Sequence, residues 1–83
     1  MIARLHGVLL EKTPEQLIVD VGGVGYQVLV SLQTFYHLPG VEEQVSLLIH
    51  THTREDTLRL YGFLEEKEKS YFLLLRSVSG IGP

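Results

Sequence analysis

The sequence contains no cysteine, which excludes disulfide scaffolds and thiolate metal sites. It also lacks a long hydrophobic run, because the longest unbroken apolar stretch is Tyr71–Leu75 and a membrane span needs roughly 20 residues. The amino terminus, Met1–Gly7, does not have the charged-then-apolar layout of a signal peptide. We therefore expect a cytoplasmic protein that has no membrane partner.

Basic residues are scarce as well. Seven Lys and Arg stand against ten Asp and Glu, which gives a net charge of −3. Residues 1–64 carry all of this excess, and residues 65–83 are neutral overall. A self-sufficient DNA-binding domain normally has a basic patch or stripe, and none is evident along this chain.

Apolar residues are plentiful for a chain of this size. Hydrophobic residues make up 45% of 83 residues, and charged residues only 20%. This composition excludes a disordered chain and predicts one small domain with a modest core. It also indicates that part of the apolar surface meets a partner.

Alternation of apolar and polar residues dominates the first 64 residues. The predicted strands are Ile2–Lys12, Gln16–Val21, Tyr26–Val30, Val45–Thr53 and Leu58–Phe63, and one short helix, Leu32–Leu38, follows the third strand after a Ser31 cap. Five strands with a helix inserted after the third are typical of a small Greek-key barrel, the OB-fold. We therefore expect a mainly β protein whose OB-fold domain spans residues 1–64.

The period changes after this barrel. Acidic residues from Glu65 onward suit the start of a helix, because they lie at the positive end of its dipole. Tyr71, Phe72, Leu75 and Val78 then recur at helical spacing and are predicted to form one apolar stripe. Residues 65–83 are therefore expected to begin a second unit.

Two motifs that suggest chemistry have simpler explanations. The glycines of Gly22–Gly25 precede a strand rather than a helix, so we expect a tight hairpin turn instead of a phosphate loop. His50 and His52 share one strand face and could supply half of a zinc site, but zinc needs three or four ligands. No nucleophile–base set or P-loop is present, so we expect no catalytic residues, no metal site and no cofactor.

Two further motifs have two interpretations each. Glu55 and Asp56 lie at a predicted hairpin tip, where adjacent acids usually form only a solvated turn. Gly80, Ile81 and Gly82 follow a helix, as in the hairpin of a helix-hairpin-helix element whose backbone amides contact DNA phosphates. A simple helix cap followed by a loop fits these last residues equally well.

Taken together, the segments resemble the RuvA family of bacterial Holliday-junction branch-migration proteins. The resembling stretches occur in the same order and cover essentially the whole chain: Met1–Gly7, Val19–Tyr26, Phe35–Pro39, Arg54–Asp56, Leu60–Phe63 and Gly80–Pro83. The resemblance implies an amino-terminal OB-fold, then the first helix and hairpin of a helix-hairpin-helix domain. RuvA proteins are considerably longer, so the chain is expected to be an amino-terminal fragment.

The resemblance also implies a function. Family members form a homotetramer that holds a four-way DNA junction open in the bacterial cytoplasm, at the nucleoid during repair, recombination and the SOS response. Glu55 and Asp56 match the acidic pin at the junction centre, Gly80, Ile81 and Gly82 match DNA-backbone contacts, and Arg54 is a possible phosphate contact. The RuvB ATPase, which binds a carboxy-terminal domain absent here, and the RuvC resolvase are the implied partners.

Two alternatives remain open at this point. An unrelated OB-fold that binds single-stranded nucleic acid would need exposed aromatic residues beside Lys and Arg, and the barrel segment has only four basic residues. A structural oligomerisation module would explain the apolar surplus but would leave the two adjacent acids at 55 and 56 without a role.

Overall fold

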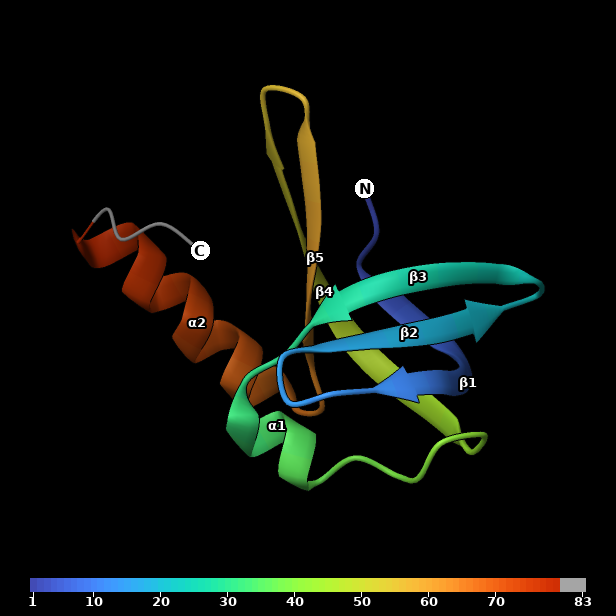
Figure 1. Cartoon of the computed structure of the whole chain (residues 1–83). Coiled ribbons are helices and arrows are strands. Elements are labelled where there is room, and N and C mark those ends of the chain that lie inside the picture. Colours follow the sequence, from blue (N-terminus) through green and yellow to red (C-terminus); the bar gives the residue numbers. More distant parts are fainter. Residues whose placement is uncertain (80–83) are drawn as a thin grey trace.

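The structure, a computed structural model, describes the backbone of residues 1–79 and the side chains of residues 1–76. Its strands are β1 (Arg4–Lys12), β2 (Gln16–Val21), β3 (Val24–Leu29), β4 (Gln44–Arg54) and β5 (Thr57–Phe63), and its helices are α1 (Leu32–Tyr36) and α2 (Glu66–Ser79). The strands close into a barrel in the order β1-β2-β3-β5-β4. Figure 1 shows α1 beneath the barrel and α2 running away from its side. This arrangement is consistent with the expected OB-fold.

Alternation along the strands builds the core. On β1, Leu5 and Leu9 are buried while Arg4 and His6 are exposed, as the period of two predicts. The core cluster combines one face of every strand with Leu38, which follows α1; its members are Leu5, Leu9, Leu17, Val19, Val28, Leu38, Val45, Leu47, Ile49 and Leu60.

The first strand serves two neighbours. It pairs with β4 from Arg4 to Val8 and with β2 from Val8 to Lys12, and the register shifts between Leu9 and Glu11. A glycine is needed close to this change of partner, because a Cβ on Gly7 would lie 2.2 Å from the backbone oxygen of Asp20. The strand begins at Arg4 rather than at Ile2, because the backbone of Ile2 bonds the hydroxyl of Thr51 instead of a strand ladder.

The predicted glycine turn and the short helix are both found, the helix with a small difference. Gly22 and Gly23 form the β2–β3 turn with φ values of 59° and 95°, so the prediction that glycines supply positive φ is confirmed. The oxygen of Ser31 accepts a hydrogen bond from the amide of Thr34 at 3.1 Å and caps α1 as predicted. The helix ends at Tyr36, two residues early, because His37 already leaves helical geometry.

The prediction for the carboxy-terminal helix is wrong in one respect. Phe72 packs against the barrel, but Tyr71 and Leu75 are 63% and 46% exposed, so they do not belong to a buried stripe. The side chain of Val78 lies outside the described residues. The docked face of α2 instead runs through Phe72 and Arg76, and Lys69 precedes them at helical spacing and acts electrostatically on His50. No described helix is long and apolar enough to cross a membrane.

Candidate nucleic-acid interface

The β4–β5 hairpin carries the candidate site. Its ladder runs from Leu48 opposite Phe63 to Arg54 opposite Thr57, and it extends well beyond the barrel (Figure 1). Every residue from Thr53 to Arg59 is exposed. At the tip, each strand extends one residue further than predicted, so the turn contains only Glu55 and Asp56.

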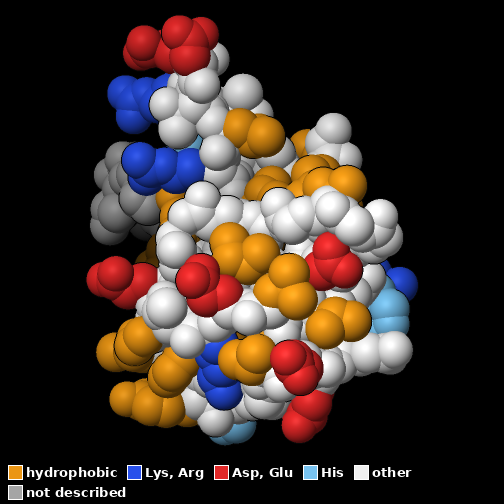
Figure 2. All heavy atoms as spheres, turned by 45° about the vertical axis from the view of Figure 1, so that its right-hand side comes forward, with side chains coloured by type: hydrophobic (Ala, Val, Ile, Leu, Met, Phe, Trp, Pro, Cys, Tyr) orange, Lys and Arg blue, Asp and Glu red, His pale blue; other side chains and the backbone are white. Residues whose placement is uncertain are grey.

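The tip of the hairpin is acidic. Glu55 adopts a left-handed backbone with φ of 52°, which allows the chain to reverse in two residues. Both carboxylates are exposed at this outermost point, and Arg54 lies directly beside them at the end of β4. Figure 2 shows this arrangement at the top of the molecule, where acidic side chains lie above Lys and Arg side chains. The structure thus places the two predicted pin residues together at the tip.

One face of the hairpin is rich in basic side chains. His50 lies opposite Tyr61, His52 opposite Arg59 and Arg54 opposite Thr57. Side chains at every second position point to the same side of a strand, so these six share one face. Arg54 and Arg59 are its exposed cations nearest the tip.

The helix α2 packs on the lower half of this face. The Phe72 ring lies 5.3 Å from Tyr61 and 5.8 Å from His50, between ring centroids. The Arg76 guanidinium donates hydrogen bonds to Nε2 of His50 at 2.8 Å and to Nδ1 of His52 at 3.1 Å. Since a protonated nitrogen cannot accept a hydrogen bond, this geometry requires both imidazoles to be neutral at these atoms.

The surrounding charges reinforce this neutral state. Burial lowers the pKa of His50, and the charges of Arg76, His52 and Lys69 lower it further. Loss of water around its half-buried ring lowers the pKa of His52, followed by the charges of Arg76, Arg54 and Arg59. Every group that shifts either pKa is a base, so this face has a positive local field.

The histidine pair thus binds an arginine side chain instead of forming half of a zinc site. An arginine donates to the ring nitrogens that a metal would occupy, and residues 1–76 contain no group of three or more His, Cys, Asp or Glu that could hold a metal ion. The sequence did not predict a common surface containing Arg59, Lys69 and Arg76. Their only sequence signal was the spacing of Lys69, Phe72 and Arg76 on one helix face.

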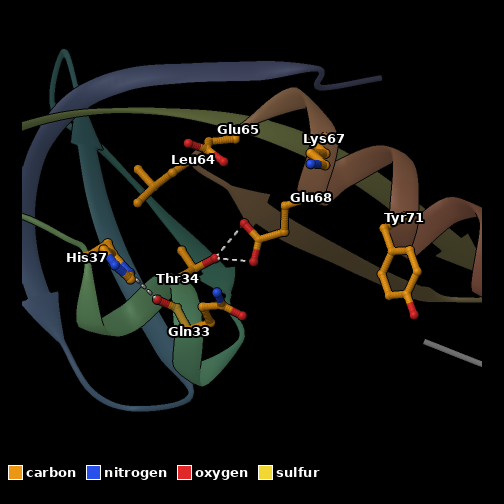
Figure 3. Close-up of a pocket in the computed structure, with 8 residues that line it drawn as sticks. All are labelled: Gln33, Thr34, His37, Leu64, Glu65, Lys67, Glu68 and Tyr71. Carbon is orange, nitrogen blue, oxygen red and sulfur yellow. Dashed lines mark hydrogen bonds between the residues drawn. The ribbon is translucent and has the colours of Figure 1, made fainter.

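A second set of contacts fixes the angle of α2. Between α1 and α2 lies a groove of about 460 Å³, and Figure 3 shows Glu68 reaching across it to Thr34. The Thr34 hydroxyl donates to the Glu68 carboxylate at 2.7 Å, and the Ser31 hydroxyl donates at 3.1 Å. Glu68 therefore directs its negative charge toward α1 and away from the hairpin. These hydrogen bonds across the groove help to position α2.

The remaining predicted contacts cannot be placed. Gly80, Ile81 and Gly82 lie outside the described residues, as does the expected hairpin of a helix-hairpin-helix element.

One known protein family matches both the barrel and the hairpin of this chain. The sequence model of the family described as RuvA N terminal domain matches residues 1–62, which is most of the chain and includes all of β1 to β4 and the hairpin tip. The chain belongs to the RuvA family. This membership excludes the alternative of an unrelated OB-fold.

Individual RuvA relatives match over the full chain. Proteins named "Holliday junction branch migration complex subunit RuvA" are 60% identical in Syntrophotalea carbinolica and 54% identical in Solibacter usitatus, each over all 83 residues. The protein of that name from Geobacter metallireducens is 52% identical over the same length. The chain spans 42% of the length of each of these RuvA relatives.

Proposed function

We propose that the protein containing this chain is a Holliday-junction DNA-binding scaffold that holds four-way junctions open and targets the RuvB motor for branch migration. The observation that carries the proposal is the exposed pair Glu55 and Asp56 at the outermost point of a hairpin, in a chain of the RuvA family. The names of the full-length relatives support the same assignment.

The two tip carboxylates would act by repulsion. In a homotetramer, two carboxylates from each of four copies would surround the junction centre. Like charges act over about a Debye length, ~8 Å at physiological salt, so the tips would keep duplex phosphates away from the centre and guide strands into separate arms. Arg54, one residue from the tip, would contact a phosphate of a diverging strand.

The protein would have no catalytic step of its own. ATP hydrolysis would belong to RuvB, bound through a carboxy-terminal domain, and junction cleavage to RuvC. Residues 65–83 would begin a second, helix-hairpin-helix domain in which Gly80, Ile81 and Gly82 contact the DNA backbone. The complex would act in the bacterial cytoplasm, at the nucleoid during repair and recombination.

The net charge supports this division of labour. A chain with a charge of −3 releases few counterions on binding DNA, so most of the attraction would come from segments beyond this chain. The exposed apolar side chains Tyr36 and Leu73 are consistent with contacts to further subunits or domains.

The experiment replaces Glu55 and Asp56 by Gln and Asn in the full-length protein, which keeps the side-chain shape and removes the charge. Affinity for linear duplex should rise about tenfold at low salt, a change of ~1.4 kcal/mol. Affinity for the junction should rise less, so junction preference falls. Both differences should shrink as salt increases, because screening weakens repulsion between exposed charges. Fluorescence anisotropy with matched junction and duplex oligonucleotides measures each affinity.

A matched control removes the same charge elsewhere. Glu42 and Glu43 are adjacent, exposed acids in the loop before β4, so the Glu42→Gln and Glu43→Gln double variant changes net charge equally. Junction preference should stay unchanged in this control. Equal effects of the two double variants, or an unchanged duplex affinity in the tip variant, would show that Glu55 and Asp56 are an ordinary solvated turn.

A further inference from the structure

Four of the seven Lys and Arg residues gather around one face of the hairpin. Arg54 and Arg59 come from β4 and β5, and Lys69 and Arg76 come from α2. All four act electrostatically on the pair His50 and His52, and no carboxylate is among the groups that shift these histidines. We name this surface the basic flank: Arg54, Arg59, Lys69 and Arg76, with His50 and His52 between them.

The basic flank is notable because the chain is acidic overall. On α2, the carboxylate of Glu68 is held toward α1 by Ser31 and Thr34. The acids at positions 55 and 56 lie beyond the flank, at the tip of the hairpin. Negative and positive charge are therefore separated along one hairpin, with the positive part nearer the barrel.

The dimensions of the flank suit a nucleic-acid strand. From His50 to Arg54 the hairpin advances about 13 Å, since a strand rises about 3.3 Å per residue. One strand of duplex DNA carries a phosphate about every 3.4 Å along the duplex axis, so the length of the flank corresponds to about four base-pair steps of that axis. Arg54 and Arg59 are exposed over the upper part of this length.

The lower part of the flank is fixed by aromatic packing. Phe72 packs on Tyr61 and Phe63 and so fixes α2 against the hairpin. Arg76 is half-buried, uses its terminal nitrogens on two imidazoles, and has no hydrogen-bond partner at Nε. A buried donor without a partner is costly, whereas a phosphate oxygen is a strong acceptor for the terminal guanidinium nitrogens once they leave the imidazoles.

We propose that the basic flank binds the phosphodiester backbone of a DNA strand, with Arg54, Arg59, Lys69 and Arg76 as the phosphate-contacting cations. The proposal rests on the proposed function for its choice of DNA as the ligand. It assigns a binding surface within this chain, beside the tip that repels the junction centre. The strand leaving the centre then meets repulsion at the tip and attraction along the flank.

Proton uptake is coupled to this binding. A proton on His50 or His52 adds a cation beside Arg54, Arg59, Lys69 and Arg76, and it breaks a hydrogen bond from Arg76. A bound polyanion offsets that repulsion and accepts the hydrogen bonds of the released guanidinium, so binding raises the pKa of both histidines. By linkage, affinity for DNA increases as the pH falls through the pKa values of these two histidines.

The first test compares two lysines of the same helix. Lys69 belongs to the flank, whereas Lys67 lines the groove on the α1 side (Figure 3). In the 83-residue chain at low salt, Lys69→Ala and Arg59→Ala should each weaken binding to a short duplex about three- to tenfold. Each should also reduce the slope of log affinity against log salt by about 0.9. Lys67→Ala should change affinity less than twofold. Equal losses for Lys67→Ala and Lys69→Ala would overturn the proposal, because net charge alone would then explain the binding.

The second test uses the histidines as reporters. His6 and His37 lie elsewhere, on β1 and after α1, and serve as internal controls for His50 and His52. In proton NMR titrations, the imidazole signals of His50 and His52 should shift on adding the duplex, and their pKa should rise. Inorganic phosphate at the same ionic strength should produce a much smaller change. Equal shifts at all four histidines, or equal effects of phosphate and duplex, would count against a backbone site.

These results separate the flank from the proposed function. Loss of binding by Lys69→Ala on linear duplex tests the flank alone, since linear duplex has no junction centre. Junction preference in the full-length protein tests the scaffold function alone. A flank that binds duplex without any junction preference would keep this inference and refute the scaffold function.

Discussion

At the scale of single residues, the histidine pair makes the stability of the fold depend on pH. Burial and neighbouring cations depress the pKa of His50, so the folded chain holds fewer protons than the unfolded chain over that pH range. A depressed histidine pKa stabilises the fold above the unfolded value, about pH 6.5, and that stability is lost as the pH falls toward the folded value. Burial sets this direction, and Arg76, which needs the lone pairs of both imidazoles, reinforces it.

We expect His50→Gln to weaken the pH dependence of stability. Glutamine can still accept a hydrogen bond from Arg76 through its amide oxygen, but it does not titrate. Urea unfolding at about pH 8 and about pH 5 should show a smaller difference in the free energy of unfolding for His50→Gln than for the native chain. The control His37→Gln changes an exposed histidine outside the pair and should leave the pH dependence as it is. A pH dependence unchanged by His50→Gln would contradict the assigned role of the Arg76 contact.

At the scale of elements, alternation and turn chemistry carried most of the prediction. The faces of β1, the Gly22–Gly23 turn and the Ser31 cap all follow from local residue types, so the sequence was sufficient for them. The extra rung of the β4–β5 ladder, Arg54 opposite Thr57, did not follow, because it depends on Glu55 adopting a left-handed backbone that glutamate seldom adopts.

The candidate site was predictable only in part, because half of it depends on contacts between residues far apart in the sequence. Two adjacent acids at a hairpin tip are visible in sequence, whereas the basic flank requires α2 to pack on the hairpin. Arg76 meets His50 and His52 across 26 and 24 residues of chain, and periodicity gives no information about such a meeting. Periodicity also favoured Tyr71 and Leu75 over the face that actually docks, because it finds an apolar arc without saying which arc meets a partner.

The close approach of β1 to β2 at Gly7 should make stability depend on the absence of a side chain there. Gly7→Ala should lower the free energy of unfolding by about 3 kcal/mol, since its Cβ would lie 2.2 Å from the backbone oxygen of Asp20 and the strands must separate. Gly40→Ala is the control, because its Cβ would meet only the flexible carboxylate of Glu43 at 3.2 Å. Gly40→Ala should change stability by about 0.5 kcal/mol or less. Urea unfolding measures both, and equal effects would contradict the importance of the close approach.

At the scale of the whole molecule, this small barrel leaves several large apolar side chains exposed outside its core. Tyr36 is 73% exposed, Leu58 61% and Tyr71 63%, and these side chains come from three different elements. Such side chains, spread over several elements, suit a chain that associates with further copies or further domains.

We expect the 83-residue chain to self-associate through this surface. Light scattering over a concentration series should show the mass rising from the 9.4 kDa of one chain toward four times that value. Because the contacts are apolar, moderate salt should leave the association intact. A mass that stays at one chain at the highest concentration would show that assembly depends on segments beyond this chain.

The split pairing of β1 also determines how the molecule can form. Its first half must find β4, and the side-chain contact between His6 and Ser46 closes a loop of 40 residues. The β2–β3 hairpin, by contrast, needs only a two-residue turn and can form within microseconds. The loop-closure entropy of distant pairings must be overcome before any contact compensates for it, so we expect barrel closure to limit the folding rate. During synthesis, the amino-terminal strand then has no β4 partner until β4 has left the ribosome, and we expect substitutions that weaken the pairing of β4 to slow folding.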